Sequence, residues 1–313
     1  MTTREVEHDI TIAAPAPAVY RLLAEVENWP LIFPPTIHVD RVEESPTQER
    51  IRIWATANGE AKNWTSRREL FPEELRITFR QEVSPAPVAS MGGTWIIEPL
   101  GEDECRVRLL HDYRAIDDDP HDLLWIDEAV DRNSRSELAA LKTNVELVHG
   151  ARELTFSFED SVRVDGEAKD VFAFIDEADR WPERLPHVAT VRFSEDTPGL
   201  QSLEMDTRAK DGSVHTTKSY RVTFPHAKIA YKQVTLPALM TLHTGRWTFV
   251  DDGTSVVATS QHTVTLNADN IAAVLGAEAT VDDARSYVHT ALSTNSLATL
   301  NHAKAFAESK RRP

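Results

Sequence analysis

Alternating apolar and polar residues recur along this chain and predict β-strands. In residues 75–83, for example, Leu75, Ile77 and Phe79 are apolar, while the residues between them are polar. A period of two is typical of a strand that has one buried face and one face in water. Several stretches of this kind follow one another, which favours an antiparallel sheet.

Two segments replace this alternation with the spacing of an amphipathic helix. Val19, Leu22 and Leu23 lie on one face of a short helix near the start, and Leu138 and Leu141 lie on one face of a long helix. Since an antiparallel sheet must cover its apolar face, the long helix is expected to pack against it. The predicted fold class is α+β, a curved antiparallel sheet that wraps around a long C-terminal helix and leaves a cavity beside it.

The same order of elements occurs twice. The dipeptide Trp-Pro begins at Trp29 and again at Trp181, 152 residues later, and a Phe-Pro dipeptide recurs at nearly the same offset. Sparse identity at a nearly constant spacing across a whole half indicates a tandem duplication. We therefore expect two domains of the same fold, residues 1–150 and 151–313.

Composition and charge narrow the class of function. Of the 313 residues, 34 are Lys or Arg and 50 are Asp or Glu, which gives a formal net charge of −16. Nucleic acids and anionic membranes bind dense basic surfaces, so neither partner is expected. No apolar run approaches the roughly 20 residues of a membrane span. The first residues lack the pattern of a signal peptide, so we expect a cytoplasmic protein.

Neither a disulfide nor a metal site is predicted. Cys105 is the single cysteine and has no partner within the chain. The cysteine and the histidines do not occur at the spacing of a zinc site. No motif in the chain indicates an organic cofactor.

An arginine in the strand around residues 64–70 is a candidate for ligand binding. Trp64, Ser66 and Arg68 point to the same side of this strand. A guanidinium group that points into an apolar interior needs acceptors, which are either oxygens of a ligand or a buried carboxylate. The pattern recurs at Ser219 and Arg221, where the neighbouring apolar positions leave it open whether these two side chains face the interior or the solvent.

A histidine in a later strand is the second candidate. His111 shares one strand face with the apolar residue Leu109, and His262 occupies the matching position in the second half. Histidine is the natural general acid or base near neutral pH if it lines a cavity. The alternative is a histidine whose hydrogen bonds are satisfied inside the core.

The element order, the Trp-Pro turn and the Ser-x-Arg strand, all present in both halves, resemble the Bet v 1-like, START-type helix-grip superfamily. Within it, the chain is similar to the didomain aromatase/cyclases of bacterial type II polyketide synthases. This resemblance covers essentially the entire chain. It implies a small-molecule cavity in each domain and first-ring cyclisation and dehydration of a poly-β-ketone carried by an acyl carrier protein. Relatives of this kind generally act on chains reduced at carbon 9 and close or aromatise the ring between carbons 7 and 12.

The resemblance also implies roles for individual residues. The family places polar groups near the start of the last helix of the domain, where Asp131 and Asn133 lie, although Asp131 and Arg135 could simply form a surface ion pair. The implied catalytic residues are Arg68, Ser66, His111 and Asp131. The implied substrate-binding residues are Trp29, Trp64, Asn133, Ser219, Arg221 and His262. The alternative function is a non-catalytic protein of the same fold that binds or transfers a lipid, quinone or pigment.

Overall fold

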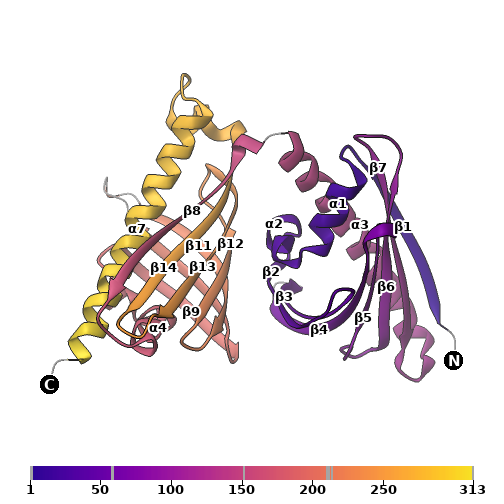
Figure 1. Ribbon diagram of the computed structural model, residues 1–313, viewed down its shortest axis with the longest axis horizontal. Coiled ribbons are helices and arrows are strands. Elements are labelled where there is room, and N and C mark those ends of the chain that lie inside the picture. Colours follow the sequence, from indigo (N-terminus) through magenta and orange to yellow (C-terminus); the bar gives the residue numbers. More distant parts are fainter. Residues whose placement is uncertain (1–2, 58–59, 151, 209–211, 213, 312–313) are drawn as a thin grey trace. The chain divides into compact units, whose positions relative to one another are not determined.

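Two similar units make up the chain. The computed structural model describes residues 3–57, 60–150, 152–208, 212 and 214–311. Contacts divide the chain into Met1–Arg152 and Glu153–Pro313. Each unit contains one seven-stranded antiparallel sheet and one long helix at its C-terminal end (Figure 1). The predicted α+β helix-grip class is therefore confirmed.

The first unit begins with a strand, continues with two short helices and ends with a long helix. In its sheet the order is β1-β7-β6-β5-β4-β3-β2, so the first and last strands are neighbours. Its elements are β1 (Arg4–Ile12), α1 (Ala16–Ala24), η1 (Val26–Asn28), α2 (Trp29–Ile32), β2 (Thr36–Glu44), β3 (Gln48–Ala57), β4 (Glu60–Phe71), η2 (Pro72–Glu74), β5 (Arg76–Gln81), β6 (Val88–Pro99), β7 (Cys105–Ala115), η3 (Ile116–Asp118) and α3 (Pro120–Gly150).

The second unit repeats this order and adds one short helix before the last. Its sheet order is β8-β14-β13-β12-β11-β10-β9. Its elements are η4 (Arg152–Leu154), β8 (Thr155–Val164), α4 (Ala168–Asp176), η5 (Ala178–Arg180), α5 (Trp181–Arg184), β9 (Val188–Thr197), β10 (Leu200–Arg208), β11 (Val214–Phe224), β12 (Lys228–Thr235), β13 (Met240–Asp251), β14 (Val256–Leu266), η6 (Ala268–Asn270), α6 (Ile271–Leu275) and α7 (Val281–Lys310).

The long helix of each unit covers the apolar face of the sheet. In the first unit, Leu138 and Leu141 of α3 pack in one buried cluster with Val107 and Leu109 of β7. In the second unit, Leu300 of α7 is fully buried in the corresponding cluster. Each fully buried leucine stabilises the packed helix by about 1.5–3 kcal/mol relative to an exposed one.

The same position in each sheet is a glycine, and an aromatic ring of a neighbouring strand lies directly over it. A Cβ atom on Gly93 would lie 2.1 Å from the carbonyl oxygen of Leu110 and 2.7 Å from the ring of Phe79. On Gly245 it would lie 2.6 Å from the hydroxyl group of Tyr231. Glycine is needed here because of the close approach of backbone and ring.

Gly93→Ala is therefore expected to destabilise the first unit by about 2 kcal/mol, because the clash is with backbone and with a ring that cannot swing away. Urea unfolding of the full chain measures this effect. Gly101→Ala is the control, because no atom lies within 4 Å of the position that its Cβ would take. Equal unfolding midpoints for the two variants would contradict the argument.

None of the described helices is both long and apolar enough to cross a membrane.

At the start of α3, the exposed side chains of Asp119 and His121, together with Asp122, are close enough to share a metal ion. The Asp119 carboxylate accepts the backbone N–H groups of His121, at 2.8 Å, and Asp122, at 3.0 Å. This carboxylate therefore caps the helix.

Candidate active site

The Trp-Pro turn and the Ser-x-Arg strand meet at the end of α1. The carbonyl oxygen of Leu23 accepts a hydrogen bond from Arg68 Nη2, at 2.9 Å, and another from Trp29 Nε1, at 3.1 Å. The last carbonyl groups of a helix have no partner within the helix and need one elsewhere. Arg68 also lies over the ring of Trp29, 5.1 Å from its centre. The two motifs together hold the short helices against the sheet.

The second unit uses the same construction at the end of α4. Arg221 Nη2 donates to the carbonyl oxygen of Ile175, at 2.7 Å, and Trp181 Nε1 donates to that of Phe174, at 3.3 Å. Arg221 is only 2% exposed and points into the interior, although the sequence left its direction open. The motifs therefore recur together because each unit must satisfy the same helix end.

A buried carboxylate compensates the charge of Arg68. Arg68 Nη1 lies 2.9 Å from Glu49 Oε1, and both side chains are 2% exposed. These two atoms are close but not aligned as a hydrogen bond, whereas Arg41 Nε donates to the second oxygen of Glu49 at 2.8 Å. Burial lowers the pKa of Arg68 to about 10, so the group stays charged at neutral pH. Of the two kinds of acceptor that the sequence left open for Arg68, the structure shows the buried carboxylate.

Arg221 has a different neighbour at the matching position. Gln201 is paired with Arg221 across β10 and β11, as Glu49 is paired with Arg68 across β3 and β4. The Gln201 side-chain amide donates to Asp176 and to Glu195, both at 2.9 Å. Burial lowers the pKa of Arg221 to about 10, and the charges of these two carboxylates act against that shift. The two units therefore compensate the charge of a buried arginine with different carboxylates, one in direct contact and two that lie beyond a glutamine.

The other candidate residues of these strands face the interior, and each of them also makes contacts that stabilise the fold. Ser66 is 4% exposed and donates to the carbonyl oxygen of Arg80 at 3.1 Å. Trp64 is half-buried and packs against the cluster that contains Ile51 and Ile53. Ser219 is half-buried on β11 and is paired with Gln233 of β12.

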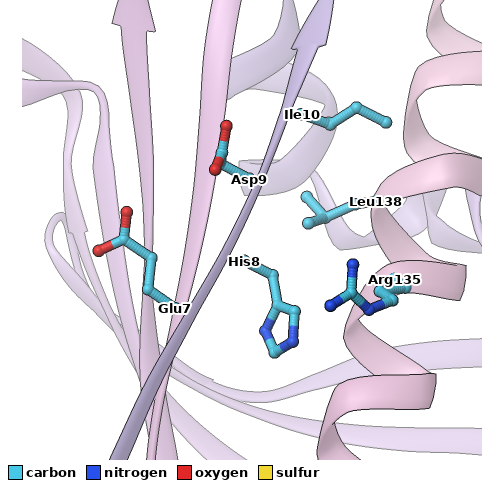
Figure 2. A pocket seen from close by; sticks show the side chains of 6 residues that line it. All are labelled: Glu7, His8, Asp9, Ile10, Arg135 and Leu138. Carbon is cyan, nitrogen blue, oxygen red and sulfur yellow. The ribbon is translucent and has the colours of Figure 1, made fainter.

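A cleft of about 410 Å³ lies between β1 and α3 (Figure 2). Figure 2 shows the imidazole ring of His8 and the guanidinium group of Arg135 reaching into it from these two elements. The His8 side chain is 9% exposed, and its Nε2 lies 2.9 Å from Asp131 Oδ1. Its Nδ1 is buried and has no hydrogen-bond partner among the described residues. The residues that line the cleft are Glu7, His8, Asp9, Ile10, Arg135 and Leu138.

His111 lies beside this cleft and is neutral at physiological pH. It is paired with Val6 of β1, next to His8, and its Nδ1 lies 3.4 Å from Ser134 Oγ of α3. The ring of Phe79 packs edge-on against it at 5.6 Å. Burial, with a smaller effect from the charge of His8, lowers the pKa of His111 to about 4. A neutral imidazole can accept a proton.

The polar residues of α3 do not point where the sequence suggested. Asp131 is half-exposed, forms the surface pair with Arg135 at 3.0 Å, and contacts His8 rather than His111. Hydrogen bonds from Arg135 and His8 lower the pKa of Asp131 to about 2. Asn133 is exposed to solvent, whereas the next residue, Ser134, is 1% exposed and faces the interior. The expectation for Asn133 is corrected, because the helix turns by about 100° for each residue.

Sequence reasoning missed two residues of this region. His8 alternates with the apolar residues Val6 and Ile10, a pattern that could have placed it on the inner face of β1. Glu137 is three residues after Ser134, so the two share one face of α3. Burial raises the pKa of the Glu137 carboxyl group to about 7. A carboxyl group of this kind can donate or accept a proton near neutral pH.

The second unit carries a larger group of buried polar side chains around its matching histidine. His262 Nδ1 lies 2.9 Å from the hydroxyl group of Tyr231 and 3.0 Å from His243 Nε2. Burial lowers the pKa of His262 to about 4 and that of His243 to about 3, and it raises the pKa of Tyr231. All three side chains are therefore neutral at pH 7. Tyr231 and His243 were not among the residues that the sequence singled out.

Known proteins match the chain along its whole length. The family described as "Polyketide cyclase / dehydrase and lipid transport" matches residues 3–146. The chain is 63% identical to a granaticin polyketide synthase bifunctional cyclase/dehydratase from Streptomyces virginiae, over 95% of this chain and 98% of that protein. It is 44% identical to an actinorhodin polyketide synthase bifunctional cyclase/dehydratase from Streptomyces coelicolor, over 96% of each.

Solved structures agree with these matches. The di-domain ARO/CYC BexL from the BE-7585A biosynthetic pathway is 65% identical and superposes with a TM-score of 0.95, covering 99% of this chain and 100% of that one. The di-domain ARO/CYC StfQ from the steffimycin pathway is 34% identical, with a TM-score of 0.89 and coverages of 97% and 99%. Because both units match, the resemblance seen in the sequence is confirmed, and the chain belongs to the family of two-domain polyketide cyclases/dehydratases.

Proposed function

We propose that this enzyme folds a poly-β-ketone that an acyl carrier protein of a type II polyketide synthase delivers and that is already reduced at carbon 9. It closes the first ring between carbons 7 and 12 and removes water to make that ring aromatic. The observation that carries the proposal is the neutral, half-buried His111 beside a polar cleft, in a chain whose relatives are named cyclase/dehydratases.

The ring-closing step needs a base and a fixed chain conformation. A methylene group between two carbonyl groups is acidic, and the neutral His111 accepts its proton when Ser134 holds the other ring nitrogen. The resulting enolate carbon attacks a distant ketone carbon, and a carbon–carbon bond forms as the carbonyl double bond opens. The ketone oxygen takes a proton from Glu137, the carboxyl group whose pKa burial raises to about 7, and becomes a hydroxyl group. Much of the rate enhancement comes from holding a long flexible chain in one reactive conformation.

The dehydration step needs an acid. Glu137, with its pKa near 7, is suited to protonate the departing hydroxyl group, which leaves as water. Each step moves only protons and forms or breaks carbon–carbon and carbon–oxygen bonds, so the proposal requires no cofactor. Asp131 orients His8 beside His111.

The residues around the Trp-Pro turn shape the cavity in this proposal. Arg68 and Ser66 act mainly as positioning residues, since Arg68 forms an ion pair with Glu49 and donates to the carbonyl oxygen of Leu23, and Ser66 donates to that of Arg80. Trp29 and Trp64 form part of the wall. In the second unit, Ser219, Arg221 and His262 are proposed to bind substrate.

Replacing His111 with asparagine is expected to slow formation of the first-ring aromatic product by about 100-fold or more, the usual contribution of a general acid or base. The test compares products of a minimal synthase with a ketoreductase in three reactions: without this protein, with the wild type, and with the variant. His121→Asn is the control, because this histidine is exposed at the start of α3.

Identical products in all reactions would contradict the enzymatic proposal for this substrate class. In that case the alternative of a binding or transfer protein would be favoured, because it requires that substitutions weaken binding without changing any product.

A further inference from the structure

The two units can be compared position by position because their strands pair in the same register. His111 and Phe79 both pair with Gly93 in the first unit. His262 and Tyr231 both pair with Gly245 in the second. The shared histidine therefore has a phenylalanine beside it in the first unit and a tyrosine in the second.

Two more neighbours of the histidine differ in the same way. Met91 and His243 each lie two residues before the matched glycine on the central strand. Leu109 and Ser260 also occupy matching positions, because each pairs with the tryptophan two residues after the matched glycine, Trp95 in the first unit and Trp247 in the second. Three apolar side chains of the first unit are thus replaced by three polar ones in the second.

In the second unit these polar groups form a connected chain of hydrogen bonds. Ser260 Oγ lies 3.0 Å from His262 Nε2, and His262 Nδ1 lies 3.0 Å from His243 Nε2. His243 Nδ1 lies 2.8 Å from Gln233 Oε1. The hydroxyl group of Tyr231 completes a triangle with the facing nitrogens of the two histidines, at 2.9 and 3.3 Å.

A set of buried polar side chains lowers the stability of a protein core. Tyr231, His243, His262 and Ser260 are at most 8% exposed, and burial of polar groups costs free energy that hydrogen bonds only partly return. The first unit shows that phenylalanine, methionine and leucine fill the same positions of the same fold. Stability alone therefore does not account for the polar set.

The hydrogen-bonded chain connects His262 with a hydroxyl group that can exchange a proton with it. At the outer end of the chain, Gln233 is paired with Ser219 across β11 and β12, and both side chains are half-buried. An imidazole that takes a proton at one ring nitrogen can release the proton of the other, so a proton taken up by His262 can pass from its Nδ1 to the oxygen of Tyr231, 2.9 Å away. An acid–base site needs this property to return to its starting state after each turnover.

We propose that Tyr231, His243 and His262 form a second acid–base centre, which removes water from the β-hydroxy carbonyl compound that ring closure in the first unit produces. This inference rests on the proposed function and moves the loss of water from Glu137 to the second unit. Glu137 then protonates only the oxygen of the ketone that is attacked during ring closure. His262 takes a proton from the carbon between the hydroxyl-bearing carbon and the carbonyl group, and a carbon–carbon double bond forms. The carbon–oxygen bond breaks, and the leaving hydroxide takes the proton of the Tyr231 hydroxyl group. His262 then gives a proton to the Tyr231 oxygen, 2.9 Å from its Nδ1, so both groups return to their starting state. The sum is one alkene and one water.

The triple variant Tyr231→Phe/His243→Met/Ser260→Leu tests this centre, because it gives the second unit the side chains of the first. Its melting temperature is expected to equal or exceed that of the wild type. With the minimal synthase and ketoreductase, the dehydrated product is expected to form at least 100-fold more slowly. A ring-closed compound heavier by one water should accumulate. Thr259→Val is the control, since Thr259 lies on the outer face of β14 and bonds to Ser161.

Each outcome has a defined meaning. Dehydrated product at the wild-type rate with the triple variant would overturn this inference and leave the proposed function intact. No product beyond the enzyme-free reaction with the wild type would overturn the proposed function and this inference with it. If the triple variant unfolds, Tyr231→Phe alone decides by the same product ratio, because it removes a single oxygen atom.

Discussion

Replacing Arg68 with alanine is expected to destabilise the first unit by about 3–5 kcal/mol, the usual cost of leaving one partner of a buried ion pair behind. The variant leaves the buried Glu49 with Arg41 as its remaining cationic partner. It also removes one of the two donors to the carbonyl oxygen of Leu23. Urea unfolding of the full chain measures the loss.

Glu49→Gln is the matched control, since the second unit has Gln201 at this position beside a buried Arg221. We expect this variant to lose less stability than Arg68→Ala, because Arg68 keeps its hydrogen bond to the carbonyl oxygen of Leu23 and the second unit accommodates a glutamine opposite a buried arginine. Product analysis separates the two roles of Arg68. If Arg68→Ala is as stable as the wild type but makes no aromatic product, the guanidinium group acts on the substrate and our positioning account is wrong.

Acid is expected to destabilise the second unit steeply below about pH 6.5. His243 and His262 have folded-state pKa values of about 3 and 4 because burial disfavours their charged forms. Below pH 6.5 the unfolded chain therefore binds protons that the folded chain does not. Stability is fully present above this pH and falls, as pH decreases toward 4, by about 1.4 kcal/mol per pH unit for each histidine.

Hydrogen exchange of the strands β12 to β14 in urea, between pH 7 and pH 4.5, measures this slope. His243→Met is the control and should lower the slope by about 1.4 kcal/mol per pH unit, since it removes one titrating histidine, while His262 and His187, whose pKa burial also lowers, remain. In the first unit the slope should be smaller, because the raised pKa of Glu137 opposes the lowered pKa of His111 over the same range. A slope that the substitution leaves unchanged would show that other groups control the acid response.

The recurrence of two motifs in the sequence has a structural explanation. Trp29 and Arg68 lie 39 residues apart and meet at one carbonyl oxygen at the end of α1. Trp181 and Arg221 meet at neighbouring carbonyl oxygens at the end of α4. A pair of motifs that occurs in both copies of a duplicated fold therefore supports the architecture first, and any role in binding is built on that architecture.

The sequence by itself determined the elements, their order and the duplication. Periods of 2 and 3.6 residues are local properties of strands and helices, so the apolar patterns around Ile77 and Leu138 are sufficient to predict them. The inward direction of Ser66 and Arg68 also follows from strand alternation, because all side chains of one parity share a face. The resemblance to the didomain cyclases required only the order of these elements and two recurring motifs.

Only the tertiary structure decided which polar groups meet. Glu49, on a neighbouring strand, neutralises the charge of Arg68. His8 contacts Asp131, which lies 123 residues later in the sequence. No periodic pattern encodes such pairs, because their distance depends on sheet register and on how the helix packs across the sheet. The same holds for α3, where a rotation of one residue separates the exposed Asn133 from the buried Ser134. Chain-local periodicity thus fixes which face a residue occupies, whereas packing between distant segments fixes its chemical partner.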